Sequence, residues 1–584
     1  MTMRIVSLFA TALLAGVSSR QQDEQLIGSG AHQFRTGQVT PTKNPQVASY
    51  SLALPSPADV YIKVSDGTEA GFSTWKRRAC GNGEPVRILV AGMRANTRYA
   101  LQAHIHFLDG TVVEDDVHWF KTGALPQWTR KIKMTVTQEP GAILQPGVEL
   151  MNSIKGPHAQ AFVSDLQGHI LWAYDMPDHQ SKRMIGFLRW KDRIRERIER
   201  FLHAGKATGP LRDSLAETAC EEAAAPMMKE MKRPADTQMV NPVKLLPNGN
   251  MLLLIGLPSH ALLVGPLPHG AHSMLREIDL TGEIIRELSI EALNEKLHAA
   301  GYKHLQLQMF HHDVEVLPNG HWVVIANQFR AGSKPGQGQV DIFGDVLIDL
   351  DTNLNPVWVW DTFDHLDIGR RPMWSPNWTH GNAVVYTPED GNLLFSMRDQ
   401  SWVIKINYGN GQGDGKVLWR LGRDGDFRLL GGQEPTDWQY GQHMGAIVGS
   451  RSAGVFRLII VDNGNARPMP NGCSCAEKQT SRPDQPLCYT TIPMFEIDEG
   501  AKTARVLMRK VFPDAEYSTW GGNANLLANG DMKVTLSSQR ARHTSLLVEY
   551  VPDNNNHEIW RMRVEGFPIY RAHRIGSLYP GVQW

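Results

Sequence analysis

The chain has 584 residues, with 60 Lys and Arg against 60 Asp and Glu, so its formal net charge at pH 7 is zero. A chain of this length exceeds the size of one hydrophobic core, which predicts two domains or one domain of repeated units. The balanced charge excludes a global field that would attract nucleic acid or an acidic membrane, so any anion site must be local.

The first residues are typical of an export signal. One positive charge within residues 1–4 precedes an apolar run over 5–17, and the small residues Ser18 and Ser19 follow. The run of about 13 residues is shorter than the roughly 20 that span a bilayer as a helix. We predict a signal peptide over 1–19, an exported protein, periplasmic or secreted, and no stable membrane insertion; a buried N-terminal helix is the alternative.

Short alternating segments separated by turn residues occupy about residues 44 to 123, at the spacing of a β-sandwich. We expect strands over 48–52, 60–64, 86–90, 99–105 and 117–123. The stretch 94–99 and the closing segment 120–123 resemble a fibronectin type III module. The resemblance implies a domain over 44–125 that acts as a spacer or contact surface, without chemistry of its own.

From about residue 135 the sequence repeats. One unit reads as four strands joined by hairpins, and its last hairpin recurs at 162–174, 275–288, 346–360, 403–420, 495–507 and 546–560. An inner turn recurs with it, as in Pro318-Asn-Gly. Six copies of a four-stranded unit predict an all-β, six-bladed β-propeller over 135–584.

Two amphipathic segments interrupt the repeat after its first copy. Apolar residues recur at helical spacing from Phe187 to Phe201, and a second run follows over about 213–232. We therefore predict a helical insertion over 185–235. A cap over one face is the usual role of such helices.

Five cysteines are present: Cys80, Cys220, Cys473, Cys475 and Cys488. An oxidising compartment favours a bridge from Cys473 or Cys475 to Cys488. Three clustered sulfurs without a fourth at zinc spacing are a weak metal signal, and we expect neither a metal nor a cofactor. Which cysteines pair stays open.

In three consecutive repeats a histidine stands just before the innermost strand, at His312, His380 and His443. Innermost strands of a propeller line its axis, so residues in the same register converge. Asn382 lies on the same side of its strand as His380, and Arg398 ends the next strand. Any one of these residues alone is more often structural, but together they offer donors for a tetrahedral oxyanion.

Several segments, in this order along the chain, resemble the arylsulfate sulfotransferase family: His312-Asp-Val-Glu-Val-Leu-Pro-Asn-Gly, Trp378-Thr-His-Gly-Asn-Ala, Ser396-Met-Arg-Asp-Gln, Val417-Leu-Trp-Arg-Leu-Gly, Gln442-His443, Val461-Asp-Asn-Gly-Asn and Tyr570-Arg-Ala. The resemblance implies a six-bladed propeller that moves sulfuryl groups from aryl sulfates to phenols without the nucleotide donor PAPS. It also implies that His443 is the nucleophile, supported by His312, His380, Asn382 and Arg398.

Two features depart from the family. Bacterial members carry a disulfide upstream of the nucleophile, whereas the clustered cysteines here follow it, and the helical insertion has no familiar counterpart.

A neutral imidazole is a competent nucleophile, which predicts a sulfohistidine intermediate and ping-pong transfer. His312 is the expected proton donor to the leaving phenolate and later the base for the acceptor.

Two alternatives remain at the level of sequence. Three histidines with an open position suit iron or copper, although a neighbouring arginine disfavours a cation. A propeller can also serve as a non-catalytic binding platform. The expected partners are small phenols and aryl sulfates, and not nucleic acid; whether the chain forms a homodimer stays open.

Overall fold

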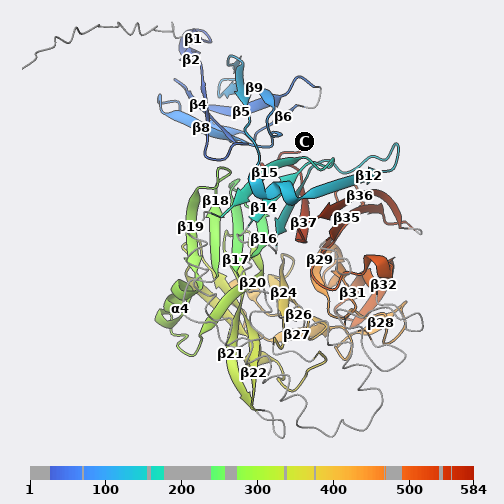
Figure 1. Cartoon of the computed structure of the whole chain (residues 1–584). Coiled ribbons are helices and arrows are strands. Elements are labelled where there is room, and N and C mark those ends of the chain that lie inside the picture. Colours follow the sequence, from blue (N-terminus) through green and yellow to red (C-terminus); the bar gives the residue numbers. More distant parts are fainter. Residues whose placement is uncertain are drawn as a thin grey trace, which may run out of the picture. The chain divides into compact units, whose positions relative to one another are not determined.

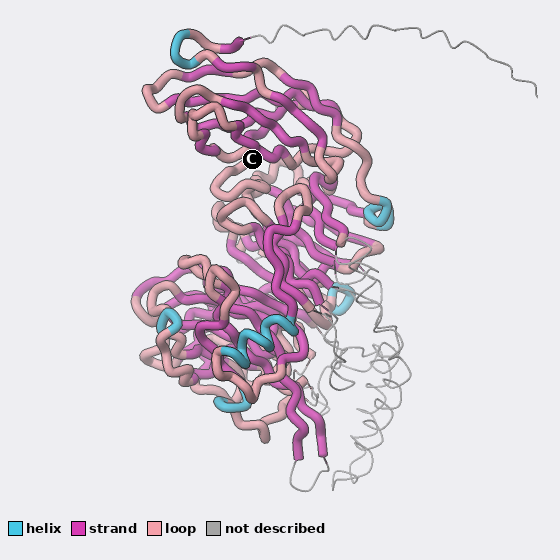
Figure 2. The backbone as a smooth tube through the Cα atoms, turned by 90° about the vertical axis from the view of Figure 1, so that its left-hand side faces the viewer, coloured by secondary structure: helices cyan, strands magenta, loops and turns pink. Residues whose placement is uncertain are grey.

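The computed structural model describes residues 26–68, 71–153, 160–176, 239–256, 273–333, 339–373, 377–465, 467, 489–537, 544–553 and 556–584. The predicted signal peptide, the helical insertion and Cys220, Cys473, Cys475 and Cys488 lie outside these residues. Strands predominate and helices are few and short, so the fold class is all-β, as predicted (Figure 2).

The chain divides into two compact units. The smaller one contains the described parts of 1–40, 49–88 and 100–120, and the larger one contains 41–48, 89–99 and the described residues from 121 onward (Figure 1).

The five strands predicted for the first module coincide with β4, β5, β8, β9 and β11. In β5 the side chains of Val60, Ile62 and Val64 are buried and alternate with more exposed residues, as expected where one face of a sheet packs on a core. The strands are β1 (Leu26–Ile27), β2 (Phe34–Arg35), β3 (Gln38–Pro41), β4 (Ala48–Ala53), β5 (Ala58–Ser65), β6 (Phe72–Ser73), β7 (Arg77–Ala79), β8 (Pro85–Val90), β9 (Arg98–Phe107), β10 (Val112–Glu114) and β11 (His118–Lys121). They pair as β1-β2, as β3-β4-β8, and as a six-stranded sheet around β5 and β9.

The larger unit contains six sheets of four or five strands among its described residues. In spatial order the first three are β15 (Ile170–Asp175), β14 (Gln160–Ser164), β13 (Val148–Ser153) and β37 (Ile569–Ile575); β16 (Met239–Leu245), β17 (Met251–Gly256), β18 (Met274–Ile278) and β19 (Ile284–Ser289); and β20 (Leu307–Val316), β21 (Trp322–Ser333), β22 (Gln339–Leu350) and β23 (Pro356–Asp361). The other three are β24 (Gly381–Thr387), β25 (Asn392–Met397), β26 (Trp402–Ile406) and β27 (Val417–Leu421); β29 (His443–Ser452), β30 (Val455–Val461), β31 (Thr490–Asp498), β32 (Thr503–Phe512) and β28 (Arg428–Leu430); and β33 (Asn523–Leu526), β34 (Met532–Leu536), β35 (Thr544–Val551), β36 (His557–Glu565) and β12 (Lys133–Gln138).

The last two strands of each four-stranded repeat form the six hairpins that the sequence predicts. Their antiparallel pairs are β14 with β15, β18 with β19, β22 with β23, β26 with β27, β31 with β32 and β35 with β36. The recurrent inner turn depends on glycine, because Gly249 and Gly320 have φ values of 84° and Gly530 has 92°. A side chain would strain that left-handed conformation.

One edge strand of each sheet contacts its counterpart in the next sheet. β37 contacts β16, and the series continues through β20, β24, β29 and β33, which in turn contacts β37. The first sheet pairs strands from both ends of this unit, with Val148 of β13 opposite Ile575 of β37. The contacts of these six strands therefore return to their starting point.

Apolar clusters fill the space between successive sheets. One contains Leu252 and Leu275 of the β16–β19 sheet together with Val324 and Ile348 of the β20–β23 sheet. The next contains Val323 and Leu347 from the opposite face of that second sheet, packed against the β24–β27 sheet. Because both faces of a sheet are buried, its strands are apolar almost throughout rather than alternating.

The described residues also contain two α-helices that the repeat analysis did not predict. α4 (Ile290–Ala299) begins at Ser289, whose side chain accepts a hydrogen bond from the backbone N–H of Ala292, and its Leu293 and Leu297 pack into the core beside β20. A shorter helix, α5 (Thr362–His365), follows β23. The three-to-four-residue spacing of apolar side chains in 290–297 is the signal that could have revealed α4.

Candidate functional site

The three predicted histidines lie on neighbouring inner strands. His380 directly precedes β24 and His443 begins β29, as expected, but His312 lies within β20 rather than before it. The reason is that β20 starts at Leu307 and its pairing with β21 is irregular between Phe310 and Val314. This bulge gives His312 an environment comparable to the other two.

The structure brings the three imidazoles together. The ring centroids of His312 and His380 are 4.9 Å apart, and the ring of Tyr570 lies 5.9 Å from His312 and 5.8 Å from His443. His312 and His443 are buried, with exposures of 5% and 1%, while 14% of the His380 side chain is exposed. His380 therefore has the greatest access to solvent.

Each histidine marks a left-handed backbone position. His312 has φ 62° and His380 has φ 49°, and at His443 the following residue, Met444, has φ 40°. Such conformations cost a non-glycine residue of order 1 kcal/mol or more, so the surrounding structure must hold them. A left-handed residue therefore lies at or directly after each of the three histidines.

The hydrogen bonds of His443 define its tautomer. Its Nδ1 lies 2.7 Å from Oδ1 of Asn463, and Nδ2 of Asn463 donates to the carbonyls of Ser518 and Gly521 at 2.8 and 3.3 Å. The amide nitrogen is thereby committed to carbonyls, and Oδ1 must accept from His443. His443 thus carries its hydrogen on Nδ1 and has a lone pair on Nε2.

Burial, and after it the positive charge of Arg398, lowers the pKa of His443 well below 6.5, against the opposing effect of its bond to Asn463. Burial also lowers the pKa of His312 well below 6.5, followed by the effects of His380 and His311. Both imidazoles are consequently neutral near pH 7. A buried neutral imidazole with a lone pair on Nε2 can act as a nucleophile.

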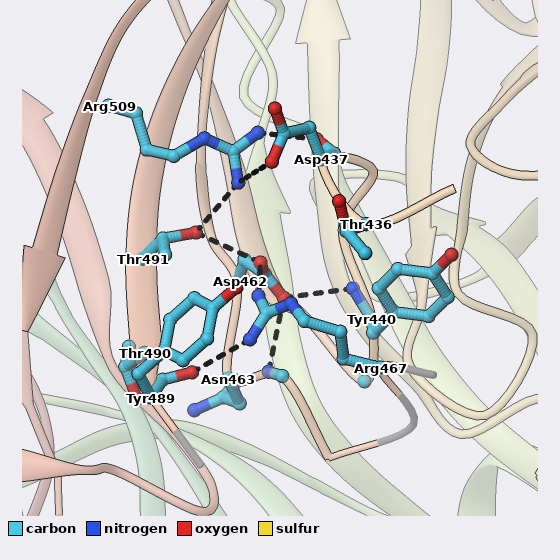
Figure 3. A network of polar contacts seen from close by, with 12 residues as sticks. Thr436, Asp437, Tyr440, Asp462, Asn463, Arg467, Tyr489, Thr490, Thr491 and Arg509 are labelled. Carbon is cyan, nitrogen blue, oxygen red and sulfur yellow. Dashed lines mark hydrogen bonds and ion pairs between the residues drawn. The ribbon is translucent and has the colours of Figure 1, made fainter. Parts of the chain in front are cut away.

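The loop after β30 positions Asn463, and Asp462 holds that loop in place (Figure 3). The Asp462 carboxylate accepts hydrogen bonds from the backbone N–H of Tyr440 at 2.9 Å and of Gly464 at 3.1 Å, and from the Thr491 hydroxyl at 2.9 Å. The guanidinium of Arg467 also pairs with it and donates to the carbonyl of Tyr489 at 3.0 Å. This buried network therefore holds Asn463 in the position from which it binds His443, the candidate nucleophile.

Arg398 directly follows β25 and lies beside His380. Its Nη1 donates to Asp399 Oδ1 at 2.7 Å, and its Nη2 donates to Asn465 Oδ1 at 3.3 Å. Nδ1 of His380 lies 3.5 Å from the same carboxylate oxygen of Asp399. Asp399 therefore orients both the guanidinium and the imidazole. It lies in one of the family-like motifs, but the sequence analysis assigns it no role.

Asn382 is fully buried in β24. Its Nδ2 donates to the carbonyl of Gln442 at 2.7 Å, which ties β24 to the residue before His443. This contact engages one N–H of the amide and leaves the second for another acceptor. All five predicted site residues are thus in one region around the inner strands.

The structure adds two residues from β37 to this region. The ring of Tyr570 lies between His312 and His443, and burial raises its pKa to about 12, so its phenol is protonated. Arg571 donates to the backbone carbonyl of Asn382 and lies 3.4 Å from Asp313. Their motif is visible in the sequence, but their place beside the histidines requires the pairing of β37 with β13.

Of the aromatic residues near the inner strands, Trp520 stacks on Tyr570 with ring centroids 6.2 Å apart. The others that border the inner strands are buried in packing, namely Trp378, Trp438, Tyr440 and Tyr517. Trp520 and Tyr570 form an aromatic wall beside the histidines.

Among the described residues, no group of three or more His, Cys, Asp and Glu side chains is arranged to hold a metal ion. No described helix has the length and apolar character to cross a membrane.

A family model described as Arylsulfotransferase (ASST) matches residues 226–571, which is more than half of the chain. This span contains the three histidines, Asn382, Arg398, Tyr570 and Arg571. No curated protein matches the sequence.

Among solved structures, a dihydro-heme d1 dehydrogenase, NirN, is 12% identical, with 78% of this chain and 83% of that chain covered and a TM-score of 0.28. A putative 6-phosphogluconolactonase from Bacteroides fragilis is 8% identical, with coverages of 88% and 98% and a TM-score of 0.30. A levansucrase from B. megaterium is 7% identical, with coverages of 58% and 82% and a TM-score of 0.26. These scores are too low to support any argument.

Proposed function

The chain belongs to the arylsulfotransferase family, and from this premise we propose that it transfers a sulfuryl group from an aryl sulfate to a phenol through a sulfohistidine on His443, without PAPS. The observation that carries the proposal is the state of His443, which is buried, neutral and bound through Nδ1 to Asn463. That state directs the Nε2 lone pair toward the substrate.

We further propose that the larger unit is a six-bladed propeller with the site at its axis. The series of contacts from β37 through β16, β20, β24, β29 and β33 back to β37 supports it, because blades arranged around an axis contact in this order. The smaller unit would then be a fibronectin III-like accessory module. The sequence pattern of residues 1–19 supports export.

In the first half-reaction, Nε2 of His443 attacks the sulfur of the aryl sulfate. The N–S bond forms as the S–O bond to the aryl group breaks, and the phenolate leaves with that electron pair. In the second half-reaction, the oxygen of an acceptor phenol attacks the sulfur and the N–S bond breaks. Nε2 regains its lone pair, which gives ping-pong kinetics.

The three sulfuryl oxygens need donors in a site shielded from water. We assign this role to Arg398, to His380 and to the second N–H of the Asn382 amide. His380, whose ring is oriented by Asp399 behind it, donates from Nε2. Arg398 faces His443 closely enough to be the largest charge effect on it after burial, which places a fixed cation beside the reacting sulfur.

His312 is the proposed proton carrier. It protonates the leaving phenolate and later removes the proton of the acceptor phenol. The aromatic wall of Trp520 and Tyr570 provides an apolar surface for a phenyl ring, consistent with small phenols and aryl sulfates as substrates.

The test is a transfer assay with 4-nitrophenyl sulfate as donor and phenol as acceptor, with no PAPS added. Replacing His443→Ala removes the nucleophile, so we expect the rate of transfer to fall by about 10⁴-fold or more. The matched control is His169→Ala, which changes a histidine whose side chain is 53% exposed and should leave the rate unchanged. Mass spectrometry of protein quenched with donor alone should find one SO₃ on the peptide that contains His443.

Three results would contradict the proposal. A His443→Ala variant with full transfer would exclude His443 as nucleophile. Donor hydrolysis that is independent of phenol would indicate a sulfatase. A stoichiometric transition metal that is required for transfer would indicate a metal enzyme.

A further inference from the structure

Behind His312 lies a chain of two more polar side chains. Nδ1 of His312 is 2.7 Å from Nδ1 of His311, and Nε2 of His311 is 3.1 Å from Oδ1 of Asp345. All three residues are buried, with exposures of 5%, 3% and 0%. Because two nitrogens in hydrogen-bond contact share one hydrogen, His311 and His312 are directly coupled.

Asp345 is held as an acceptor. Its second oxygen, Oδ2, accepts hydrogen bonds from the hydroxyl of Thr379 at 2.7 Å and from the backbone N–H of Gly381 at 2.5 Å. These two donors fix the carboxyl group of Asp345 beside Nε2 of His311. Nδ1 of His311 can then either accept a hydrogen from His312 or, as an imidazolium, donate one to it.

The two central histidines therefore have different partners at Nδ1. His443 is backed by the amide of Asn463, which orients the ring but cannot take up or release a proton. His312 is backed by an imidazole that is paired with a carboxylate, which can do both. This difference fits a nucleophilic role for His443 and a proton-carrying role for His312.

The groups around the two rings differ. Neighbouring His380, at the start of β24, and Arg571 of β37 oppose a proton on His312. Lys244 of β16 lies 3.4 Å from Asp313, the residue after His312, and Arg571 neutralises the same carboxylate. Asp345 of β22, by contrast, lies against His311.

We propose that His311 and Asp345 are positioning residues that store the proton used by His312. This inference rests on the proposed function and assigns the proton's route. Before transfer, His311 is an imidazolium paired with the Asp345 carboxylate, and His312 is neutral with its hydrogen on Nε2. As the phenolate leaves, the Nε2 hydrogen of His312 passes to its oxygen while the Nδ1 hydrogen of His311 passes to Nδ1 of His312.

After this step His311 and His312 are both neutral and Asp345 is unchanged. Removal of the proton from an acceptor phenol runs the same shifts in reverse, so protons balance over one cycle. His312 never becomes a cation, which is consistent with its burial among positive charges.

The experiment varies the leaving group. His311→Asn retains an amide oxygen that can accept from Nδ1 of His312 but cannot carry a proton. With phenyl sulfate, whose phenolate is basic and needs a proton, the sulfation rate of His443 should fall by about 10²–10⁴-fold. With 4-nitrophenyl sulfate, whose phenolate is weakly basic, the loss should be no more than about tenfold.

The matched control is His321→Asn. His321 also contacts a carboxylate of β22, with its Nδ1 3.1 Å from Asp349 Oδ1, but Asp349 is bound on its other side by the Tyr408 hydroxyl. Both donors should react at the wild-type rate in this variant. Equal losses for the two donors in His311→Asn would overturn the proposal while leaving sulfuryl transfer intact.

A measurement that needs no turnover tests the proposal even if a variant does not fold or the protein does not transfer sulfuryl groups. Nitrogen chemical shifts of ¹⁵N-histidine-labelled wild-type protein near pH 7 should show a cationic ring for His311, absent in His311→Asn, and neutral rings for His312 and His443. A neutral His311 would overturn the proposal regardless of activity. Loss of transfer in the wild type alone would contradict only the proposed function.

Discussion

At the scale of single residues, the contact between His443 and Asn463 controls the pH dependence of transfer. The pKa of His443 is well below 6.5. We therefore expect kcat/KM to be constant above pH 6.5 and to fall only in more acidic buffer, where His443 takes up a proton. Asn463→Asp places a negative charge next to Nδ1, which favours the imidazolium. We expect the acid limb of the kcat/KM profile to move upward by about one to three pH units.

The comparison for this prediction is Asn529→Asp, in the turn before β34, where Asn529 contacts Asp531 and Gln145 rather than the histidines. It should leave the profile unchanged. An acid limb that stays in place in Asn463→Asp would show that the protonation of another group limits transfer.

At the scale of elements, a buried ion cluster joins the first and last sheets of the larger unit. Glu149 of β13 lies 2.9 Å from Nζ of Lys533 in β34 and accepts from Nε of Arg574 in β37 at 2.7 Å. Burial alone would raise the pKa of Glu149, but Lys533 and Arg574 outweigh it and lower that pKa. Glu149 and Lys533 side chains have no exposed surface.

Replacing Lys533→Met removes one partner and leaves Glu149 undercompensated. The free energy of unfolding should fall by about 3–5 kcal/mol, measured from urea transitions. Lys416→Met is the control, because Lys416 pairs with Asp414 on the surface and such pairs contribute about 0–1 kcal/mol. Similar losses in both variants would mean that the buried cluster does not hold the two sheets together.

At the scale of the whole molecule, buried neutral histidines make stability depend on pH. Burial lowers the pKa of His312, His443 and His573 well below 6.5 in the folded protein. The unfolded chain binds their protons first, so stability is full above about 6.5 and is lost as pH falls toward the folded values. The urea midpoint should therefore decrease from about pH 7.5 to about pH 5.5.

The variant His573→Asn isolates this effect, since His573 lies on β37 and is not assigned to the chemistry. Carboxyl groups with raised pKa, such as Glu315, act in the opposite direction but are the same in both proteins. The midpoint of the variant should decrease less over the same pH range. An equal decrease would show that His573 is not neutralised by folding.

Repetition made much of the fold accessible from sequence. Each outer hairpin is a local structure, so two short apolar segments and a turn between them, such as those at Gly168 and Gly282, suffice to locate it. The sequence predicts the convergence of His312, His380 and His443 from a common register, which His312 approaches only through the irregular pairing of β20. Two features could be recognised only from the packing. These are the helix α4 between β19 and β20, and the start of β20 five residues before His312.

The partners that give each site residue its role were not accessible in this way. Asn463 and Asp399 lie in family-like motifs but carry no role that the sequence reveals, and Asp345 is 34 residues from His311. The bulge in β20 between Phe310 and Val314 directs His311 toward a strand that is not its immediate neighbour in the sheet. No periodicity encodes such a contact.

The sequence by itself therefore determined the all-β class, the six hairpins and the set of histidines, because these depend on local pattern and on residue type. Only the tertiary structure decided which nitrogen of His443 is free, which residues lie behind His312 and how the first and last sheets join. These properties depend on hydrogen bonds and burial between segments far apart in the chain, where charge and solvent access are set.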